Sequence, residues 1–372
     1  MADRKRTLTG YRPTGKLHLG HWFGNLQNML ALQEDYDAFY FVADWHAMTS
    51  MWADTSEIRR FTEEQVLDWI AAGLDPAKCT IYRQSDVPEV AELMMYFSMV
   101  TPMSWLERVP SYKEQREQIT DKDLGNVGFF LYPMLQAADI TIVRADLVPV
   151  GEDQLPHLEL TREIVRRFNN AYPGADGTGY LVEPAALTPK EGARVPGTDG
   201  RKMSKSYGNA IFLDDGPDEI SAKVMSMITD PARKLKTDPG DPDICPLHAI
   251  HKLVSPYAAD IAHWDSCCRV AECGCVAHKK KLVEDLTAYL APFQARRARL
   301  AAKPGYAWEV LEQGAEDARP VIREVVEEVR RLVRIDAEKV TPAEPSVREE
   351  LLKLQGSTRS SATRRALGDA GR

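Results

Sequence analysis

The feature that most constrains the fold is the alternation of short apolar strands with amphipathic helices over the first 170 residues. Residues 39–43 form an uninterrupted apolar run, which is typical of a strand buried on both faces of a parallel sheet. Further strands are predicted over 5–9, 80–84 and 146–150, and helices over 18–33, 54–73, 89–100, 128–140 and 153–169. This spacing predicts an α/β fold with a doubly wound parallel sheet.

The rest of the chain has a different pattern. Residues 172–201 are rich in Gly, Pro and Thr and are expected to form a long functional loop. Beyond residue 215 the strands end, and helices are predicted over 216–300, interrupted at 237–246, and as a pair over 306–335. Asp54 and Glu57 are spaced as a capping box at the start of their helix. We predict domains at 1–215, 216–300 and 301–355, and a small, polar, basic and disordered tail at 356–372.

Composition and length are typical of a globular protein with more than one domain. A chain of 372 residues with 44% hydrophobic and 27% charged residues is long enough for two domains with a sizeable core. The net charge of −8 argues against general coating of nucleic acid, although a local basic face remains possible. No apolar run reaches membrane-span length and the first residues are charged, so we expect a cytoplasmic protein without a membrane partner.

Two short motifs at opposite ends of the α/β pattern carry residues suited to phosphate chemistry. The first is His18-Leu19-Gly20-His21, whose histidines project from one face of a helix start. Gly20 removes a side chain where a purine could lie close. The second is Lys202-Met203-Ser204-Lys205-Ser206, in a segment rich in Gly and Ser that can close over a triphosphate. Displacement of pyrophosphate needs fixed donors at one end and mobile cations at the other.

Together and in this order, the two motifs resemble the ATP-handling signatures of class I aminoacyl-tRNA synthetases. Further strings at 42–49, 106–113, 132–140, 148–154 and 194–209 make the chain similar to bacterial-type tryptophanyl-tRNA synthetases over roughly residues 7 to 335. The resemblance implies a Rossmann-like catalytic domain, a smaller all-α anticodon-binding domain, a homodimer, and the substrates L-tryptophan, ATP with Mg²⁺, and tRNA(Trp).

The resemblance also implies roles for individual residues. The catalytic residues would be His18, His21, Lys202 and Lys205. ATP would be held by the two lysines and by Arg12, Thr14, Gly20, Gly151, Asp153, Met203, Ser204 and Ser206. Two positions depart from many relatives: Arg12 replaces a glutamine, and His21 restores the second histidine of the motif.

The amino-acid pocket follows from the same resemblance. Asp139 matches the acidic residue that accepts the indole N–H, which is a donor-only group well suited to a carboxylate. A phenylalanine would leave that acceptor unpaired, and a tyrosine would not fill the bicyclic slot. The other residues expected around the bound tryptophan are Tyr11, His46, Gln136, Val148, Val150 and Gln154.

Five of the six cysteines crowd into 245–275. Cys245, Cys268 and Cys275, followed by His278, match the spacing of a four-cysteine pattern that binds a [4Fe-4S] cluster in some relatives, with histidine in the fourth place. A zinc ion is the alternative, and a metal-free remnant competes with both. Cys267 and Cys273 could supply a replacement thiolate. We expect no disulfide in a cytosolic chain.

The interpretation is a tryptophan–tRNA ligase that forms tryptophanyl-adenylate and then charges tRNA(Trp). Two alternatives remain open: a tyrosine-specific class I synthetase, and a non-catalytic tRNA-binding or metal-sensing paralogue. A redox iron–sulfur protein is disfavoured, because the cysteines occupy a small part of a chain built around ATP. The basic stretches 279–281 and 296–299 would suit an RNA backbone.

Overall fold

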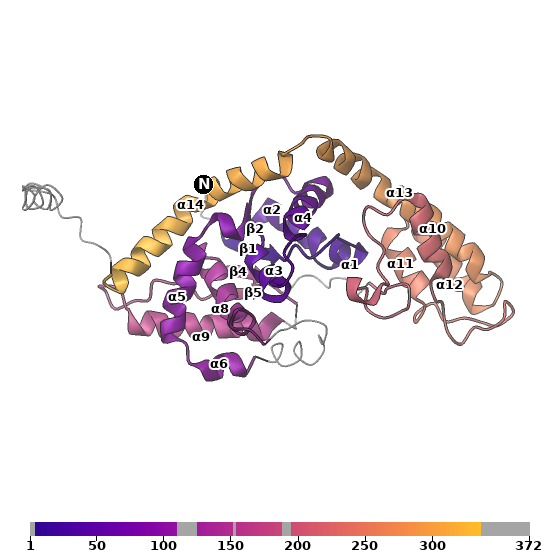
Figure 1. Cartoon of the computed structure of the whole chain (residues 1–372). Coiled ribbons are helices and arrows are strands. Elements are labelled where there is room, and N and C mark those ends of the chain that lie inside the picture. The colour runs from indigo at the N-terminus through magenta and orange to yellow at the C-terminus, as the bar shows by residue number, and fades with distance from the viewer. Residues whose placement is uncertain (1–3, 110–124, 152–153, 188–194, 336–372) are drawn as a thin grey trace, which may run out of the picture. The chain divides into compact units, whose positions relative to one another are not determined.

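The computed structural model describes residues 4–109, 125–151, 154–187 and 195–335 (Figure 1). The chain divides into two compact units, Met1–Leu332 and Val333–Arg372. Only residues 333–335 of the second unit are described, so the predicted tail at 356–372 lies outside the described residues, as does Asp153. The predicted domain boundaries remain predictions.

A parallel sheet forms the centre of the first unit. In the described residues it has five strands, β1 (Arg6–Tyr11), β2 (Asp37–Val42), β3 (Cys79–Arg83), β4 (Leu147–Pro149) and β5 (Ala185–Leu187). Their order is β3-β2-β1-β4-β5, and each neighbouring pair is parallel. Leu8 pairs with Phe39, and Phe39 in turn with Thr80. The predicted α/β class and four predicted strands are confirmed.

The fifth strand, β5, was predicted to be part of a loop. Its sequence is only Ala185-Ala186-Leu187, within a stretch rich in Gly and Pro. Such a short run carries no alternating pattern, and it becomes a strand only because it pairs with Leu147, Val148 and Pro149 of β4.

The helices of the α/β region alternate with the strands. They are α1 (Leu19–His21), η1 (Trp22–Leu26), α2 (Gln27–Asp35), α3 (Asp44–Met51), α4 (Ile58–Ala72), η2 (Gln84–Asp86), α5 (Glu89–Val100), α6 (Met103–Glu107), α8 (Val127–Ile142), α9 (Leu155–Ala171) and η4 (Lys205–Tyr207). The predicted capping box is wrong: α4 begins at Ile58, and the Asp54 carboxylate instead accepts hydrogen bonds from the backbone N–H and hydroxyl of Ser56.

The later helices are α10 (Pro217–Ser226), α11 (Pro246–Val254), α12 (Ala258–Arg269), α13 (Cys275–Ala301) and α14 (Tyr306–Leu332). The predicted pair over 306–335 is one helix, which continues through Pro320. This helix packs on β3 so closely that a Cβ at Gly314 would lie 1.8 Å from the carbonyl oxygen of Ile81. Among the helices of the described ranges, none combines the length and apolar character needed to cross a bilayer.

The first helical segment contains a π-turn. The backbone N–H of Gln27 donates to the carbonyl of Trp22, five residues earlier, so η1 is wider than the α-helices on either side. The Trp22 indole N–H donates to the Tyr289 hydroxyl at 2.8 Å, and Phe23 stacks on the Tyr289 ring. The turn therefore ties the His18–His21 motif to α13.

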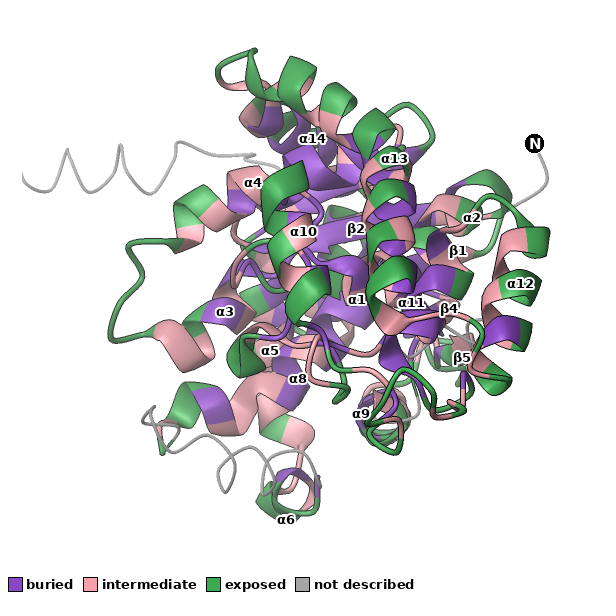
Figure 2. Ribbon diagram, turned by 90° about the vertical axis from the view of Figure 1, so that its right-hand side faces the viewer, coloured by how far each residue is buried: buried purple, intermediate pink, exposed green. Residues whose placement is uncertain are grey.

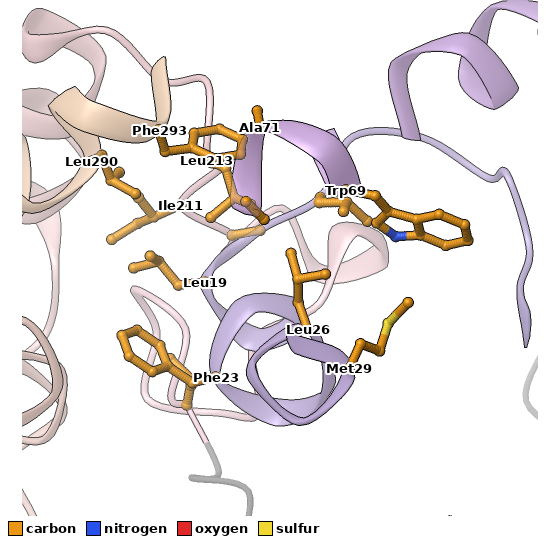
Figure 3. Packing of buried hydrophobic residues seen from close by; sticks show 14 of the residues in the cluster. Leu19, Phe23, Leu26, Met29, Trp69, Ala71, Ile211, Leu213, Leu290 and Phe293 are labelled. Carbon is orange, nitrogen blue, oxygen red and sulfur yellow. The ribbon is translucent and has the colours of Figure 1, made fainter. Parts of the chain in front are cut away.

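One hydrophobic cluster joins the sheet, the first helices and the later helices. Figure 3 shows Leu26 and Met29 near Trp69, and Leu19 beside Ile211 on the side where Leu290 and Phe293 of α13 lie. Strand β2 is buried along nearly its whole length (Figure 2), as its continuous apolar sequence predicts. The core therefore holds the His18–His21 motif in place through Leu19, Phe23 and Leu26.

Candidate active site

A cavity of about 320 Å³ opens beside the carboxyl ends of the parallel strands. Gly10 reaches it from β1, Arg12 and Ala43 from the residues just after β1 and β2, His46 from α3, and Val150 from the residue after β4. This is where open α/β sheets bind ligands. Of the residues predicted to contact tryptophan or ATP, those lining it are Arg12, His46, Gln136, Asp139, Val148, Val150, Gly151 and Gln154.

Asp139, on α8, is the buried carboxylate of this cavity, with 1% of its surface exposed. Gln84 donates through Nε2 to Oδ1 at 2.8 Å and to Oδ2 at 2.9 Å, and His46 Nε2 lies 2.9 Å from Oδ2. Burial raises the pKa of Asp139, while the hydrogen bonds from His46 and Gln84 oppose that rise. The donors thus favour an ionised carboxylate in a site that by itself would favour the neutral acid.

Gln84 was missed by the sequence analysis. It is fully buried and directly follows β3, as His46 follows β2. Its position at the carboxyl edge of the sheet was a usable signal, but nothing local indicates that its amide meets Asp139, 55 residues away.

His18 and His21 lie together at the start of α1, with ring centroids 3.7 Å apart. The backbone N–H of His18 donates to His21 Nδ1 at 3.2 Å, so neutral His21 carries its proton on Nε2. Burial and the Lys205 charge lower the pKa of His18 to about 4, and burial lowers that of His21 further. Both rings are therefore neutral donors near pH 7, not cations.

Gly20 makes room for the first histidine. A Cβ at this position would lie 2.9 Å from Cε1 and Nδ1 of the His18 ring. The structure thus supplies a reason for glycine here other than the purine contact expected from the sequence.

Lys205 is a cation close enough to the histidine motif for its charge to lower the pKa of both His18 and His21. Its Nζ lies 3.4 Å from Thr14 Oγ1. Burial and the charge of Arg12 lower the pKa of Lys205 to about 8. Two positive groups held near each other beside an open cavity form an environment that favours a polyanion.

The loop that carries Lys205 is held in place by a buried side chain and by the side chain of Asn209. Met203 is buried, and the side chain of Asn209 accepts from the Ser204 N–H at 2.8 Å and donates to the Lys202 carbonyl at 3.2 Å. Ser206 is exposed.

Lys202 and Tyr11 have neighbours other than those expected from the sequence. The exposed Lys202 borders a second cavity with Gly200, Asp243 and Pro246, and its backbone pairs with Pro196. The Tyr11 ring packs edge-on against His21 and Trp69. The described residues that line the main cavity do not include Tyr11, Thr14 or any predicted residue of the histidine motif or of the lysine loop 202–206.

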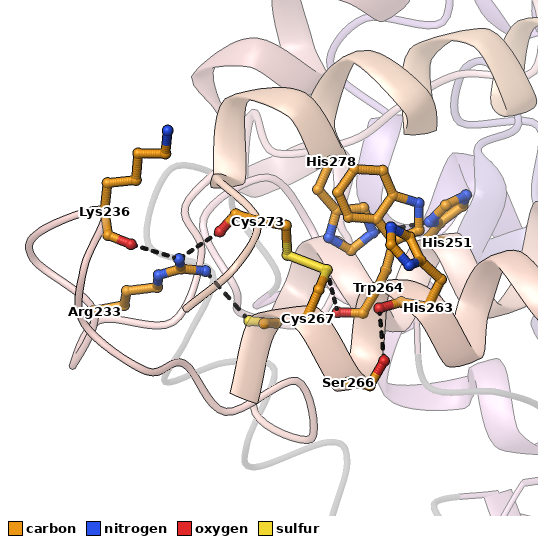
Figure 4. The surroundings of a disulfide bond; sticks show 10 residues. Arg233, Lys236, His251, His263, Trp264, Ser266, Cys267, Cys273 and His278 are labelled. Atoms are coloured by element: carbon orange, nitrogen blue, oxygen red, sulfur yellow. Dashed lines mark hydrogen bonds between the residues drawn. A yellow bond between two sulfur atoms is a disulfide. The ribbon is translucent and has the colours of Figure 1, made fainter. Parts of the chain in front are cut away.

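The expectation that this chain forms no disulfide is wrong. Cys267 and Cys273 form a disulfide, so neither is available as a replacement thiolate in this structure (Figure 4). The C-terminal end of α12 and the turn before α13 bring these two residues within 5.3 Å between Cα atoms. That proximity across a tight turn could not be deduced from their spacing.

The predicted metal ligands share a small cavity. Cys245, Cys268, Cys275 and His278 all line it, and the three cysteines are thiols. Arg233 donates to Cys268 Sγ at 3.5 Å. Within the part of the chain that the structure describes, no three Cys, His, Asp or Glu side chains are arranged to hold a metal ion.

His278 belongs to a chain of buried polar groups. Its Nε2 lies 2.8 Å from His251 Nδ1, and His251 Nε2 lies 2.7 Å from Asp285 Oδ2. Its ring stacks on Trp264 with centroids 4.5 Å apart. Burial lowers the pKa of His278 to about 3, so the imidazole is neutral. If the Asp285 carboxylate accepts from His251, the proton between the two histidines sits on His278 Nε2 and leaves Nδ1 as a lone pair.

Comparison with known proteins places this geometry in a family. The family model for class I tRNA synthetases (W and Y) matches residues 2–291. The tryptophan–tRNA ligase of Thermotoga maritima is 45% identical over 337 residues, covering 89% of this chain and 99% of the relative. That of Aquifex aeolicus is 38% identical over 399 residues, covering 89% of this chain and 100% of the relative.

Comparison with solved structures leads to the same family. The tryptophanyl-tRNA synthetase of Campylobacter jejuni, complexed with ADP and tryptophan, superposes with a TM-score of 0.80 at 33% identity, covering 88% of this chain and 99% of that one. A tyrosyl-tRNA synthetase from Archaeoglobus fulgidus, at 22% identity and a TM-score of 0.60, shares the fold alone. The chain therefore belongs to the class I aminoacyl-tRNA synthetases, in the family of the tryptophan–tRNA ligases.

Proposed function

We propose that this chain activates L-tryptophan with ATP to form tryptophanyl-adenylate and then transfers the tryptophanyl group to tRNA(Trp). The observation that carries the proposal is the main cavity, which has the buried Asp139 carboxylate and the apolar Val148 and Val150 in its lining. Arg12 lines the same cavity, and Lys205 lies near Arg12. A site with an indole acceptor on one side and phosphate-binding cations on the other suits an amino acid and ATP together.

The indole would be selected by Asp139. The ring N–H donates to the carboxylate, and Val148 and Val150 contact its apolar surface. The polar groups for the remainder of the amino acid are His46, Gln136 and Gln154. Tyr11 would act indirectly, by supporting His21.

The tryptophan carboxylate attacks the α-phosphorus of ATP, the bond to the β-phosphate oxygen breaks, and pyrophosphate leaves. Because His18 and His21 are neutral, they stabilise the α-phosphate as hydrogen-bond donors, and Lys205 supplies positive charge to the leaving group. Mg²⁺ accompanies the ATP phosphates. A terminal ribose hydroxyl of the tRNA then attacks the mixed anhydride, and AMP leaves.

The remaining ATP contacts divide between the strand ends and the lysine loop. Thr14 precedes the histidine motif and Gly20 lies within it, and Gly151 and Asp153 follow β4 in the sequence. The loop contributes Lys202, Met203, Ser204 and Ser206. Lys202 reaches the triphosphate only if the loop rearranges, because here it borders a different cavity. Catalysis then depends on positioning and electrostatics, with no covalent protein intermediate.

ATP–pyrophosphate exchange measured with all twenty amino acids tests this function. Tryptophan alone should support exchange. The Asp139→Asn variant should lower kcat/KM for tryptophan by about tenfold to a hundredfold, because a neutral amide is a weaker acceptor for the indole N–H. Exchange with tyrosine would restore the tyrosine-specific alternative, and exchange with no amino acid would favour a non-catalytic paralogue.

We also propose a metal centre in the helical region, a [4Fe-4S] cluster or zinc, held by Cys245, Cys268, Cys275 and His278. The support is that these four side chains line one cavity, with an imidazole whose Nδ1 the Asp285–His251 chain leaves as a lone pair. Binding would require the thiols to move together and lose their protons, since burial raises the pKa of Cys245 and of Cys268.

Residues 216–300 would form the anticodon-binding region, with Lys279, Lys280 and Lys281 near the proposed metal centre as contacts for the RNA backbone.

We further propose a homodimer that covers an exposed apolar face. Met95 and Met99 on α5, Met103 on α6 and Val127 on α8 are all more than half exposed. A charged substitution at Met99 should yield monomers in sedimentation equilibrium, and an unchanged dimer would contradict this surface.

A further inference from the structure

We propose that Gln84 is a positioning residue that sets the selectivity of the pocket for the indole N–H, by leaving Asp139 one open acceptor position. The inference rests on the proposed role of Asp139 as the indole acceptor. Gln84 itself is not among the described residues that line the cavity, so its effect must pass through the carboxylate.

The hydrogen bonds around Asp139 occupy most of the acceptor positions of its carboxylate. A carboxylate offers about four acceptor positions, two on each oxygen. Within the described residues, Oδ2 accepts from Gln84 at 2.9 Å and from His46 at 2.9 Å, so both of its positions are occupied. Oδ1 accepts only from Gln84, at 2.8 Å. The remaining position is therefore on Oδ1, and it is the one that a substrate N–H can fill.

The orientation of the Gln84 amide is determined by its other contact. Its Oε1 accepts the backbone N–H of His46 at 3.4 Å, which places Nε2 on the carboxylate side. A reversed amide would set oxygen against oxygen at Asp139 and is excluded. Gln84 thus contacts both the Asp139 carboxylate and the backbone of His46, which is the other residue that contacts that carboxylate.

The turn that carries Gln84 is itself held in place. Gln84 begins the short helix η2, and the next residue, Ser85, donates through its backbone N–H and its hydroxyl to the Asp44 carboxylate. Asp44 starts α3, the helix that carries His46. The donors on Asp139 therefore share one rigid support, which is what a preorganised acceptor requires.

A single open acceptor discriminates between ligands more sharply than a loosely held carboxylate. A ligand with N–H fills the open position on Oδ1, whereas an isosteric ligand without a donor leaves a buried acceptor unpaired. Without Gln84, the carboxylate could turn, bind water or take up a proton, and each of these reduces the penalty against the ligand that lacks N–H. Gln84 should therefore contribute to selectivity beyond its contribution to folding.

The test compares tryptophan with β-(3-benzothienyl)alanine, in which sulfur replaces the indole N–H. The readout is the ratio of kcat/KM values for the two amino acids in ATP–pyrophosphate exchange. Because both are measured on one preparation, the fraction of folded enzyme cancels. The wild-type ratio should be about tenfold to a hundredfold in favour of tryptophan. Gln84→Met, which keeps length but cannot donate, should reduce that ratio about tenfold.

Gln33→Met is the matched control, because Gln33 is also buried but bonds to Gly73 and Asp75, away from the cavity. Its ratio should equal that of the wild type. If Gln84→Met does not fold, Gln84→Asn, which keeps an amide on a shorter side chain, should lower the ratio in the same direction.

The outcomes separate the two proposals. A wild-type enzyme that does not distinguish the two amino acids would overturn the role of Asp139 and with it the proposed pocket. A selective wild type, a non-selective Asp139→Asn variant and a Gln84→Met variant with the wild-type ratio would overturn the role of Gln84 alone.

Discussion

Lys205 should destabilise the free protein while it accelerates catalysis. Its ammonium is partly buried and lies near Arg12, so its pKa falls from 10.5 to about 8. That difference corresponds to about 3 kcal/mol between the charged and neutral forms. Because Lys205 remains partly exposed and solvent screens its charge, we expect about 1–2 kcal/mol of actual destabilisation.

The destabilisation of the folded state by Lys205 should decrease as the pH rises. Since the pKa is lower in the folded state than in the unfolded state, the destabilisation is fully present below about pH 8 and fades as the pH rises toward 10.5. Lys205→Met removes the charge at similar length. The variant should melt about 1–3 °C above the wild type at pH 7, and this gap should shrink at pH 9.5.

The same variant should lose activity. Without the ammonium near the departing pyrophosphate, the kcat of ATP–pyrophosphate exchange should fall about 100-fold to 1,000-fold, with little change in the KM for tryptophan. Lys202→Met is the stability control, because it removes an exposed charge of the same loop and should leave the melting temperature unchanged. A Lys205→Met variant that melts below the wild type, with unchanged exchange, would refute the reasoning.

Two further predictions concern the metal centre and the packing of α14. Protein purified without oxygen should be brown, with iron and sulfide in near-equal amounts, if the centre is a cluster, and colourless with stoichiometric zinc otherwise. His278→Cys should slow bleaching of a cluster in air, whereas a metal-free wild type that charges tRNA normally would exclude either centre. Gly314→Ala should lower the free energy of unfolding by about 3 kcal/mol in denaturant titrations, because the added Cβ would overlap the Ile81 carbonyl. Gly24→Ala should leave the free energy of unfolding unchanged, because a Cβ there would meet nothing within 4 Å. Equal losses of stability at both positions would contradict the close packing of α14 on β3.

The architecture could be predicted where one stretch of sequence carried the signal. The apolar run at 39–43 indicated a buried parallel strand, and β2 is buried as expected. The main cavity gathers His46, Asp139 and Val148 at the strand ends, where residues of a doubly wound sheet converge.

Features that depend on distant pairing could not be predicted. Gln84 meets Asp139 only because η2 and α8 lie side by side, and no local pattern reports that contact. The disulfide between Cys267 and Cys273 depends on the turn between α12 and α13. The helix α14 continues through Pro320, against the local propensity of proline, because its apolar face packs on β3 and α5.

The π-turn at Trp22–Leu26 makes the length of this segment as important as its composition. An α-helix advances about 100° for each residue, so one residue more or less changes the rotational phase of everything that follows. Deleting Gly24 would regularise the hydrogen bonds, yet it would rotate Met29 out of the core and shift the carbonyl that accepts the Tyr40 hydroxyl. Insertions and deletions within this turn would therefore separate the His18–His21 motif from its contacts with α13.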